Sequence, residues 1–318
     1  MDKKVFSFWY SKLGFKGFSK LELLCIKSWL DKGYIFELYT YNLDDILFKK
    51  LDTLFENFKL KDANEIIPFD ELFYDDRGAG LAAFSDYFRF VKIARGGGIW
   101  VDMDMLCLAG FKQIKQDYIF ITELIDDKSN FEQVITTSVL SFPNDSKFAN
   151  TLIDKAKFII NSKRDPKTKL FPWGIIGPRF LAACVKEFDF EKFAFDYKKA
   201  CQIPYFEAEK FIFNETLDET QLCLHFYTEM WRGKKLKKNA TYYKDCIYER
   251  LQQKHDINEL LRKLDYKIPF FDKYIYGHIC YIKWKIKNSF LIKIWHKSKI
   301  REYLRHPKKL FCNQFKKH

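Results

Sequence analysis

The sequence predicts an α/β fold with a mostly parallel, Rossmann-type sheet flanked by helices, followed by a basic helical C-terminal extension. Three observations support this prediction. The N-terminal residues up to Tyr41 have the pattern strand, helix, strand, which is the βαβ unit of a parallel sheet. A helix, a glycine turn and a strand follow at residues 82–101. Positive charge is concentrated after residue 272, whereas the preceding chain is nearly neutral.

The opening unit is defined by local signals. Val5–Trp9 is a short apolar run, as expected of a buried strand. Ser19 precedes an apolar-periodic segment and Glu22 follows three residues later, a capping-box spacing that predicts a helix ending near Gly33. Tyr34–Tyr41 then predicts the second strand.

The later elements are predicted from apolar residues at helical spacing and from glycines that end a helix. Asp44–Lys59 is expected to form a helix. Ala82–Arg95 has apolar residues at helical spacing, and the triple glycine Gly96–Gly98 would end that helix with a left-handed cap. A strand then begins at Ile99–Val101. The remaining predicted elements are strands at Tyr118–Thr122 and Val134–Leu140 and helices at Phe148–Asn161 and Pro178–Lys186.

The basic charge belongs to the C-terminal end of the chain. Residues 273–318 contain eleven Lys, two Arg and one acidic residue, Glu302, for a net charge of +12, whereas the rest has 42 basic and 41 acidic residues. Interleaved aromatic residues and isoleucines suit an anionic membrane surface. We expect no nucleic acid partner because no base-reading motif is present. A helical appendage packed on the body is the alternative, and the apolar residues do not gather on one helical face.

Cysteines and hydropathy indicate where the protein acts. The eight cysteines are scattered and none forms a CxxC pair, so we expect buried thiols in a reducing compartment. The N-terminus has no signal-peptide core, and no stretch approaches the ~18 uncharged apolar residues of a spanning helix. We therefore expect a cytoplasmic protein, either free or peripheral on the cytoplasmic face of the inner membrane.

The strongest chemical signal is the pair Asp102 and Asp104 at the end of an apolar strand. Period-two alternation places both carboxylates on one side if the strand stays extended. Ligands of open α/β sheets bind at the carboxyl ends of strands. Adjacent carboxylates repel unless they share a cation, and Mn²⁺ or Mg²⁺ takes oxygen ligands and bridges to phosphates. The pair therefore predicts a divalent metal site that stabilises a departing diphosphate, with a solvated loop as the alternative.

The segment Ser85–Met105, SDYFRFVKIARGGGIWVDMDM, resembles the DXD region of retaining GT-A glycosyltransferases. The pattern is most similar to glycosyltransferase family 32 and to bacterial capsular polysaccharide glycosyltransferases. The resemblance covers roughly residues 3–235 and implies a GT-A-like catalytic domain, which we place at residues 1–245. It does not cover the basic, aromatic-rich extension at residues 246–318, whose composition suits association with a membrane. The matching residues are Ser85, Asp86, Arg89, Gly97, Gly98, Trp100, Asp102 and Asp104.

The resemblance also implies roles for individual residues. Asp104 would bind the metal directly, and Asp102 would bind it through water or bind sugar hydroxyls. Asp86 and Arg89 would reach the donor sugar and its diphosphate, although an i,i+3 salt bridge is the simpler interpretation. Trp9 would stack on the nucleotide base, unless it is only a core residue. The donor-binding residues implied are Trp9, Asp86, Arg89, Trp100, Asp102 and Trp231, and the catalytic ones are Asp102, Asp104 and Arg89.

A late segment resembles the His…Trp region of the same families. It runs from His225 to Trp231 with the sequence HFYTEMW. His225 would complete the metal site with Asp102 and Asp104, Glu229 is its rival, and a buried structural histidine is the alternative. Trp231 would cover the diphosphate through its indole N–H. Arg77, on a glycine-containing loop, is a weaker candidate for contact with donor or acceptor.

These observations predict a Mn²⁺- or Mg²⁺-dependent hexosyltransferase. It would move a sugar from a UDP-sugar donor to a bacterial surface glycan, either capsular polysaccharide or lipooligosaccharide, and the resemblance implies retention of anomeric configuration. Two alternatives stay open: a sugar-phosphate transferase that uses the same metal, and a non-catalytic membrane- or nucleic-acid-binding protein with a transferase-like fold. The sequence has no P-loop, GxSxG or GxGxxG motif, which argues against those enzyme classes.

Overall fold

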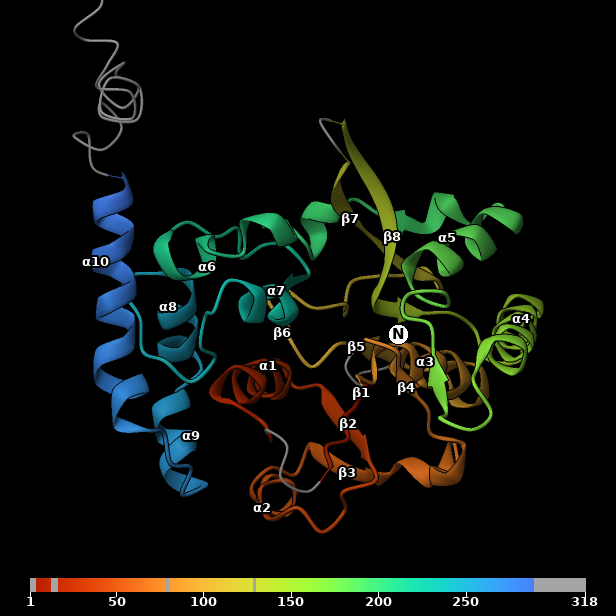
Figure 1. Ribbon diagram of the computed structural model, residues 1–318, viewed down its shortest axis with the longest axis horizontal. Helices are drawn as coiled ribbons and strands as arrows, with labels where there is room; N and C mark the ends of the chain where they lie inside the picture. Colours follow the sequence, from red (N-terminus) through yellow and green to blue (C-terminus); the bar gives the residue numbers. More distant parts are fainter. Residues whose placement is uncertain (1–3, 13–16, 78–79, 128–129, 289–318) are drawn as a thin grey trace, which may run out of the picture.

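The computed structural model describes residues 4–12, 17–77, 80–127 and 130–288. Its centre is a seven-stranded sheet with the order β10-β7-β8-β5-β1-β2-β3 (Figure 1). Every strand runs parallel to the others except β8, which is antiparallel to both β5 and β7. This confirms the predicted mostly parallel α/β sheet. The strands are β1 (Lys4–Phe8), β2 (Ile35–Thr40), β3 (Phe58–Asp62), β5 (Ile99–Val101), β7 (Ile119–Asp127), β8 (Asn130–Ser141) and β10 (Ala194–Phe195).

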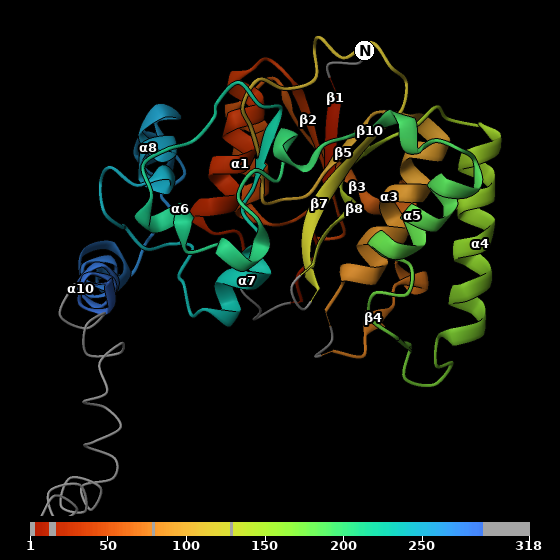
Figure 2. The same cartoon turned by 90° about the horizontal axis from the view of Figure 1, so that it is seen from above.

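Helices cover both faces of this sheet, as a buried parallel sheet requires. Figure 2 shows α3, α4 and α5 on one side and α1, α6 and α8 on the other. Each side has its own buried apolar cluster, and α2 contributes to the one beneath α1. These helices are α1 (Lys20–Asp31), α2 (Ile46–Leu54), α3 (Ala82–Gly96), α4 (Lys147–Lys163), α5 (Pro178–Glu187), α6 (Lys210–Phe213) and α8 (Ile247–Lys254).

The opening βαβ unit forms as predicted. The Ser19 side chain accepts a hydrogen bond from a backbone N–H of α1, and the Glu22 carboxylate accepts one from the Ser19 backbone N–H at 2.7 Å. This reciprocal cap fixes the start of α1. Gly33 follows the helix with φ of +72°, a conformation that glycine adopts without strain.

The helix predicted over Asp44–Lys59 is wrong in its second half. Helix α2 ends at Leu54, and Phe58–Asp62 forms β3 alongside β2. The fully buried Phe58 stacks on Phe36 of β2 with nearly parallel rings. Pairing with a strand distant in sequence outweighs the local helical pattern here, because the pairing buries an aromatic side chain that a surface helix would expose.

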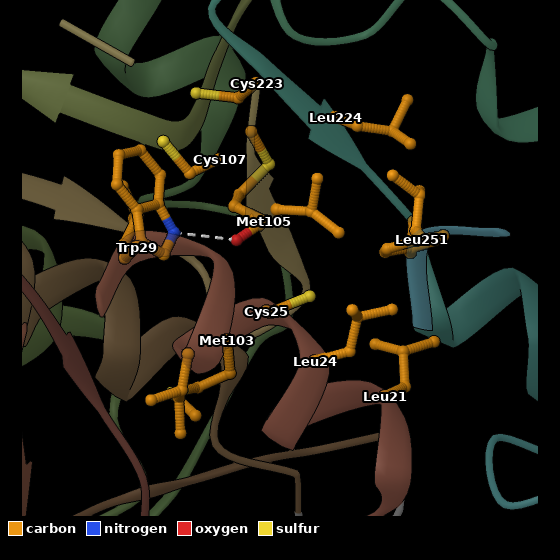
Figure 3. Close-up of a cluster of buried hydrophobic side chains, with 14 of the residues drawn as sticks. Leu21, Leu24, Cys25, Trp29, Met103, Met105, Cys107, Cys223, Leu224 and Leu251 are labelled. Carbon is orange, nitrogen blue, oxygen red and sulfur yellow. Dashed lines mark hydrogen bonds between the residues drawn. The ribbon is translucent and has the colours of Figure 1, made fainter. Parts of the chain in front are cut away.

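Two small sheets lie beside the main one. In the first, β6 (Met105–Cys107) pairs antiparallel with β11 (Cys223–His225), and in the second β4 (Tyr74–Asp75) pairs with β9 (Leu170–Phe171). Helix α1 anchors β6: the Trp29 indole N–H donates to the Met105 carbonyl at 2.9 Å, as Figure 3 shows. Because the surrounding side chains are buried and apolar, β6 is held firmly just after Asp104.

The C-terminal part of the described chain is helical. Buried side chains of α8 and α9, among them Tyr248 and Ile257, belong to the same apolar cluster as α1. The predicted boundary at residue 246 falls at the start of α8, and most of the basic tail, 289–318, lies outside the described residues. The remaining helices are α7 (Thr228–Gly233), α9 (Ile257–Lys263), a π-helical turn (Asp272–Tyr276), α10 (Gly277–Asn288) and 3₁₀ turns at Ala63–Glu65, Phe69–Glu71, Glu191–Phe193, Tyr197–Lys199 and Tyr205–Glu207.

Two expectations about the whole chain can be compared with this structure. The seven cysteines within the described residues are free thiols; six are buried, and Cys280 is partly exposed. Cys312 lies outside the described residues. Among the helices of the described chain, none combines the length and hydropathy needed to cross a bilayer.

The junction between the body and α10 depends on one glycine. A Cβ added at Gly277 would lie 1.8 Å from the Thr241 carbonyl oxygen. Gly277→Ala is therefore expected to lower the free energy of unfolding by about 1–3 kcal/mol, measured by urea denaturation. Gly233→Ala is the control, because a Cβ at Gly233 meets no described atom within 4 Å. An unchanged stability of Gly277→Ala would show that α10 is not held closely against Thr241.

Candidate metal centre and donor site

The candidate site lies where β1 and β5 end side by side. After β1 the chain moves to β2 on one flank, and β5 occupies the other flank, so the gap between β1 and β5 is a topological switch point. Trp9 follows β1 directly and Asp102 follows β5 directly. The topology therefore brings both predicted residues to the edge at which ligands of such sheets bind.

Asp102 and Asp104 meet through a turn, not through an extended strand. β5 ends at Val101, the Met105 N–H donates to the Asp102 carbonyl at 2.9 Å, and β6 begins at Met105. The expected period-two geometry is thus wrong, although both carboxylates still point to one place. The Met103 side chain between them is buried in the cluster beneath α1.

His225 completes the group from a distant part of the chain. It ends β11, where it pairs in register with Met105, one residue after Asp104. Its Nε2 lies 3.3 Å from the Asp104 Oδ1. Asp102, Asp104 and His225 each present one ligand atom, and these atoms lie within 4.8 Å of one another. The sequence-based trio therefore converges.

Thr228 orients Asp104 and was missed in the sequence. Its backbone N–H and its hydroxyl both donate to the Asp104 Oδ2, at 2.8 and 2.9 Å. Tyr227, with φ of +52°, turns the chain sharply into α7 and so places Thr228 against Asp104. The spacing of three residues after His225 was the available signal, but a lone threonine carries no metal-site pattern of its own.

Arg89 is buried between the two carboxylates that precede and follow the glycine turn. Its guanidinium lies 3.1 Å from Asp102 and 3.4 Å from Asp86, so the i,i+3 pair considered from sequence is present. It also donates to the Thr137 carbonyl and lies over the Trp100 ring, 4.3 Å from the centroid. Through these contacts Arg89 holds the Asp102 carboxylate in place beside Asp104 and His225.

Trp100 also holds the Asp102 carboxylate. Its indole N–H donates to the Asp102 Oδ1 at 2.8 Å, and its ring is 1% exposed. Sequence resemblance placed Trp100 among donor-binding residues. In this structure its indole holds Asp102 and its edge borders a hollow beside Trp9, so it acts as a positioning residue.

Burial sets the electrostatics of the acidic groups. It raises the pKa of Asp86 to about 6, although Arg89 opposes the shift. It also raises the pKa of Asp102 and of Glu123, against the attraction of Arg89 and His225 respectively. At Asp104 burial is outweighed by His225 and by Thr228, so its pKa falls below the usual range. The raised pKa values of Asp86, Asp102 and Glu123 mean that ionising these carboxyl groups costs free energy. A bound cation would reduce that cost.

The Asp86 shift makes stability depend on pH. A folded-state pKa of about 6, above the ordinary value of 3.8, means that the folded protein binds the proton more tightly than the unfolded chain, so stability falls as pH rises through this interval. The advantage of wild type over Asp86→Asn in unfolding free energy should thus fall by about 2–3 kcal/mol from about pH 4 to pH 7. Urea denaturation of both proteins at the two pH values measures this difference, and a constant difference would contradict it.

Two hollows meet at the metal group. The larger has a volume of about 750 Å³ and includes Glu123, Tyr227 and Trp173 in its lining. The smaller, about 380 Å³, is bordered by Trp9 and Ser7. Both hollows are lined by Ala82, Arg89, Asp102, Asp104 and Thr228, and His225 lines only the larger one. The two aspartates therefore lie between a space beside Trp9 and a wider space bordered by the β7–β8 hairpin.

Two sequence-predicted residues lie elsewhere than expected. Trp231 is fully buried, and its indole N–H donates to the Phe226 carbonyl at 2.9 Å, so this N–H is bonded within the core and not directed at either hollow's lining. The apolar run that suggested a ligand-covering tryptophan is instead part of the core. Glu229 is ion-paired with Arg232 at the cavity wall and does not belong to the metal trio.

The rim of the larger cavity carries Arg77 and an aromatic residue that sequence reasoning missed. The Trp173 indole is 48% exposed, and the Arg77 guanidinium lies over its ring at 4.3 Å from the centroid. Trp173 precedes Gly174 in the loop before α5, where no local motif distinguishes a rim aromatic from an ordinary surface one.

Comparison with known proteins gives only distant likenesses. No protein-family model matches the sequence, and no curated protein matches it. Among solved structures the chain is similar to the PaToxG glycosyltransferase (TM-score 0.41, 15% identity, spanning 58% of this chain and 69% of that chain). It is also similar to the glycosyltransferase GlyE of Streptococcus pneumoniae TIGR4 (0.36, 12%, 85% and 66%) and to the UDP-bound glycosyltransferase domain of the YGT toxin (0.36, 11%, 83% and 97%). All three TM-scores are below 0.5, so the chemistry of this site is inferred from its own residues.

Proposed function

We propose that this protein is a metal-dependent glycosyltransferase that takes a sugar from a UDP-sugar donor and transfers it to a hydroxyl of a glycan acceptor. One observation carries the proposal: Asp102, Asp104 and His225 converge within 4.8 Å, and the two aspartates line two adjoining hollows. A diphosphate at this point would have one hollow for its nucleoside and another for the sugar and acceptor.

The three side chains Asp102, Asp104 and His225 are suitable ligands for a divalent cation. Two carboxylates supply hard oxygen ligands, and the imidazole nitrogen favours Mn²⁺ over Mg²⁺. When bound, the cation neutralises negative charge on the leaving diphosphate. Thr228 fixes the Asp104 carboxylate through two hydrogen bonds, and Arg89 with Trp100 fixes that of Asp102. The site is thus pre-organised, which lowers the cost of binding the donor in a reactive geometry.

The two hollows indicate how the UDP-sugar would be oriented, with its base in one hollow and its sugar in the other. Trp9 is partly exposed at the smaller hollow and packs edge-on against Phe18, which leaves its indole available as a platform for a flat base. The larger cavity then holds the sugar and the acceptor, with Trp173 and Arg77 at its rim.

Three finer features belong to this proposal through the resemblance of Ser85–Met105. They are transfer of a hexose, retention of anomeric configuration and an acceptor that is a bacterial surface glycan, capsular polysaccharide or lipooligosaccharide. The geometry of the site supports the donor end of the reaction more directly than the acceptor end, because a metal held by Asp102, Asp104 and His225 would bind the diphosphate of the donor.

The test is a screen of UDP-sugars by thermal shift and by product release, with Mn²⁺, with Mg²⁺ and with a chelator. We expect one donor to raise the melting temperature only with metal, because ligand binding stabilises by mass action, and to yield UDP. Release of UMP would establish the sugar-phosphate transferase instead. Absence of metal-dependent binding to every donor would overturn the proposal and favour the non-catalytic alternative.

A further inference from the structure

Helix α10 has two apolar faces, and only one of them is used by the body. On the inner face, Gly277 approaches Thr241, the Tyr281 ring stacks on Tyr243, and the Trp284 ring stacks on Phe213 with a centroid distance of 4.9 Å. This face fixes the helix at the end of the molecule opposite α4, as both views show (Figures 1 and 2).

The outer face presents a row of isoleucines to solvent. Ile279, Ile282 and Ile286 are 37%, 57% and 54% exposed, and their spacing of three and four residues aligns them along one side of the helix. Phe270, Phe271, Tyr274 and Ile275 are exposed just before this row. The tail's apolar residues failed to gather on one face in the sequence because α10 uses two opposite faces. An apolar row that stays exposed along one side of a helix is typical of an interaction surface.

Every charged side chain of α10 itself is basic. Helix α10 contains Lys283, Lys285 and Lys287 and no acidic residue, and Asp272 before it is ion-paired with Lys237 at 2.6 Å. Residues 289–318 add a net charge of +8 in the sequence. An apolar row bordered by lysines has the composition of a helix that lies in the interface of an anionic bilayer.

We propose that the outer face of α10 docks this protein on an anionic lipid surface, with the isoleucines entering the interface and the lysines meeting the headgroups. A second copy is a poorer occupant, because a two-fold pairing through this face would bring lysines against lysines. Nucleic acid would use the lysines but leaves the isoleucines unexplained. Among the described residues, none of α10 lines either hollow, so docking does not require the donor site to be occupied.

The experiment is vesicle flotation of the full chain. Phosphatidylcholine vesicles with phosphatidylglycerol should retain it, and pure phosphatidylcholine vesicles should not. The variant Ile279→Ser/Ile282→Ser/Ile286→Ser should bind at least about tenfold more weakly, because it removes the apolar contribution. Lys283→Gln/Lys285→Gln/Lys287→Gln should weaken binding and reduce its dependence on salt.

A matched control separates this face from general stickiness. Ile46, Leu54 and Phe158 are also exposed apolar residues, and their replacement by Ser should leave vesicle binding unchanged. UDP-sugar turnover in solution should be equal in all these variants, so this surface and the donor site can fail independently. The proposal is overturned if the isoleucine variant binds vesicles as wild type does. It is equally overturned if light scattering finds a dimer that this variant dissociates, or if wild type binds DNA but no vesicles.

Discussion

Replacing Asp104 with Asn is expected to lower metal-dependent UDP-sugar turnover by at least about a hundredfold. The amide keeps the shape of the side chain and an oxygen that can accept from Thr228, but it removes the negative charge that faces His225 across 3.3 Å. Because a divalent ion needs that charge, Mn²⁺ affinity should fall with turnover. Isothermal titration with Mn²⁺ and the rate of UDP release measure the two effects.

Glu229→Gln is the matched control for this prediction. Glu229 is a carboxylate in the wall of the same cavity, but its partner is Arg232 and it stands outside the metal trio. Its neutralisation should change turnover by less than about threefold. A wild-type rate in folded Asp104→Asn, or a larger loss in Glu229→Gln, would move the metal site away from Asp104.

Among the variants considered, Arg89→Met should lose the most stability, about 3–5 kcal/mol in the free energy of unfolding. The guanidinium is buried, and it is the counter-charge within 3.4 Å of both Asp86 and Asp102. Its removal leaves two acidic groups in a poorly solvated place. Urea denaturation at neutral pH measures the loss.

Two further variants make the interpretation specific. Asp86→Asn/Arg89→Met should recover part of the stability, because one buried negative charge is removed together with its partner. Arg232→Met removes an arginine whose ion pair is mostly exposed, and should cost no more than about 0.5–1 kcal/mol. Equal losses in Arg89→Met and Arg232→Met would show that the Arg89 network contributes nothing beyond an ordinary surface ion pair.

Local signals in the sequence were sufficient to predict those elements whose stabilising contacts are made between residues close together in the chain. The capping box at Ser19 and the helix before the triple glycine were both predicted, since their determinants lie within a few residues of each other. β3 was missed because Phe58 is stabilised by Phe36 of another strand. Strand identity in that case depends on a neighbour that local periodicity does not contain.

The residues of the candidate site also differ in whether the local sequence was enough to predict them. Asp102 and Asp104 were found because their spacing is visible in a line of sequence. Thr228 and the burial of Trp231 were not, since both depend on how the segment after β11 returns to β6. His225 was found only through resemblance, and its place beside Asp104 follows from strand pairing.

The antiparallel pairing of β6 with β11 ties the metal trio to the order in which the chain is made. Thr228 and Asp104 are 124 residues apart, and helices α4, α5 and α6 are formed from the intervening chain. During synthesis the two aspartates therefore emerge long before their imidazole partner. A nascent chain can complete much of its central sheet before Asp102, Asp104 and His225 meet, so assembly of the candidate metal site waits for the closing of a long loop, one of the slower events in folding.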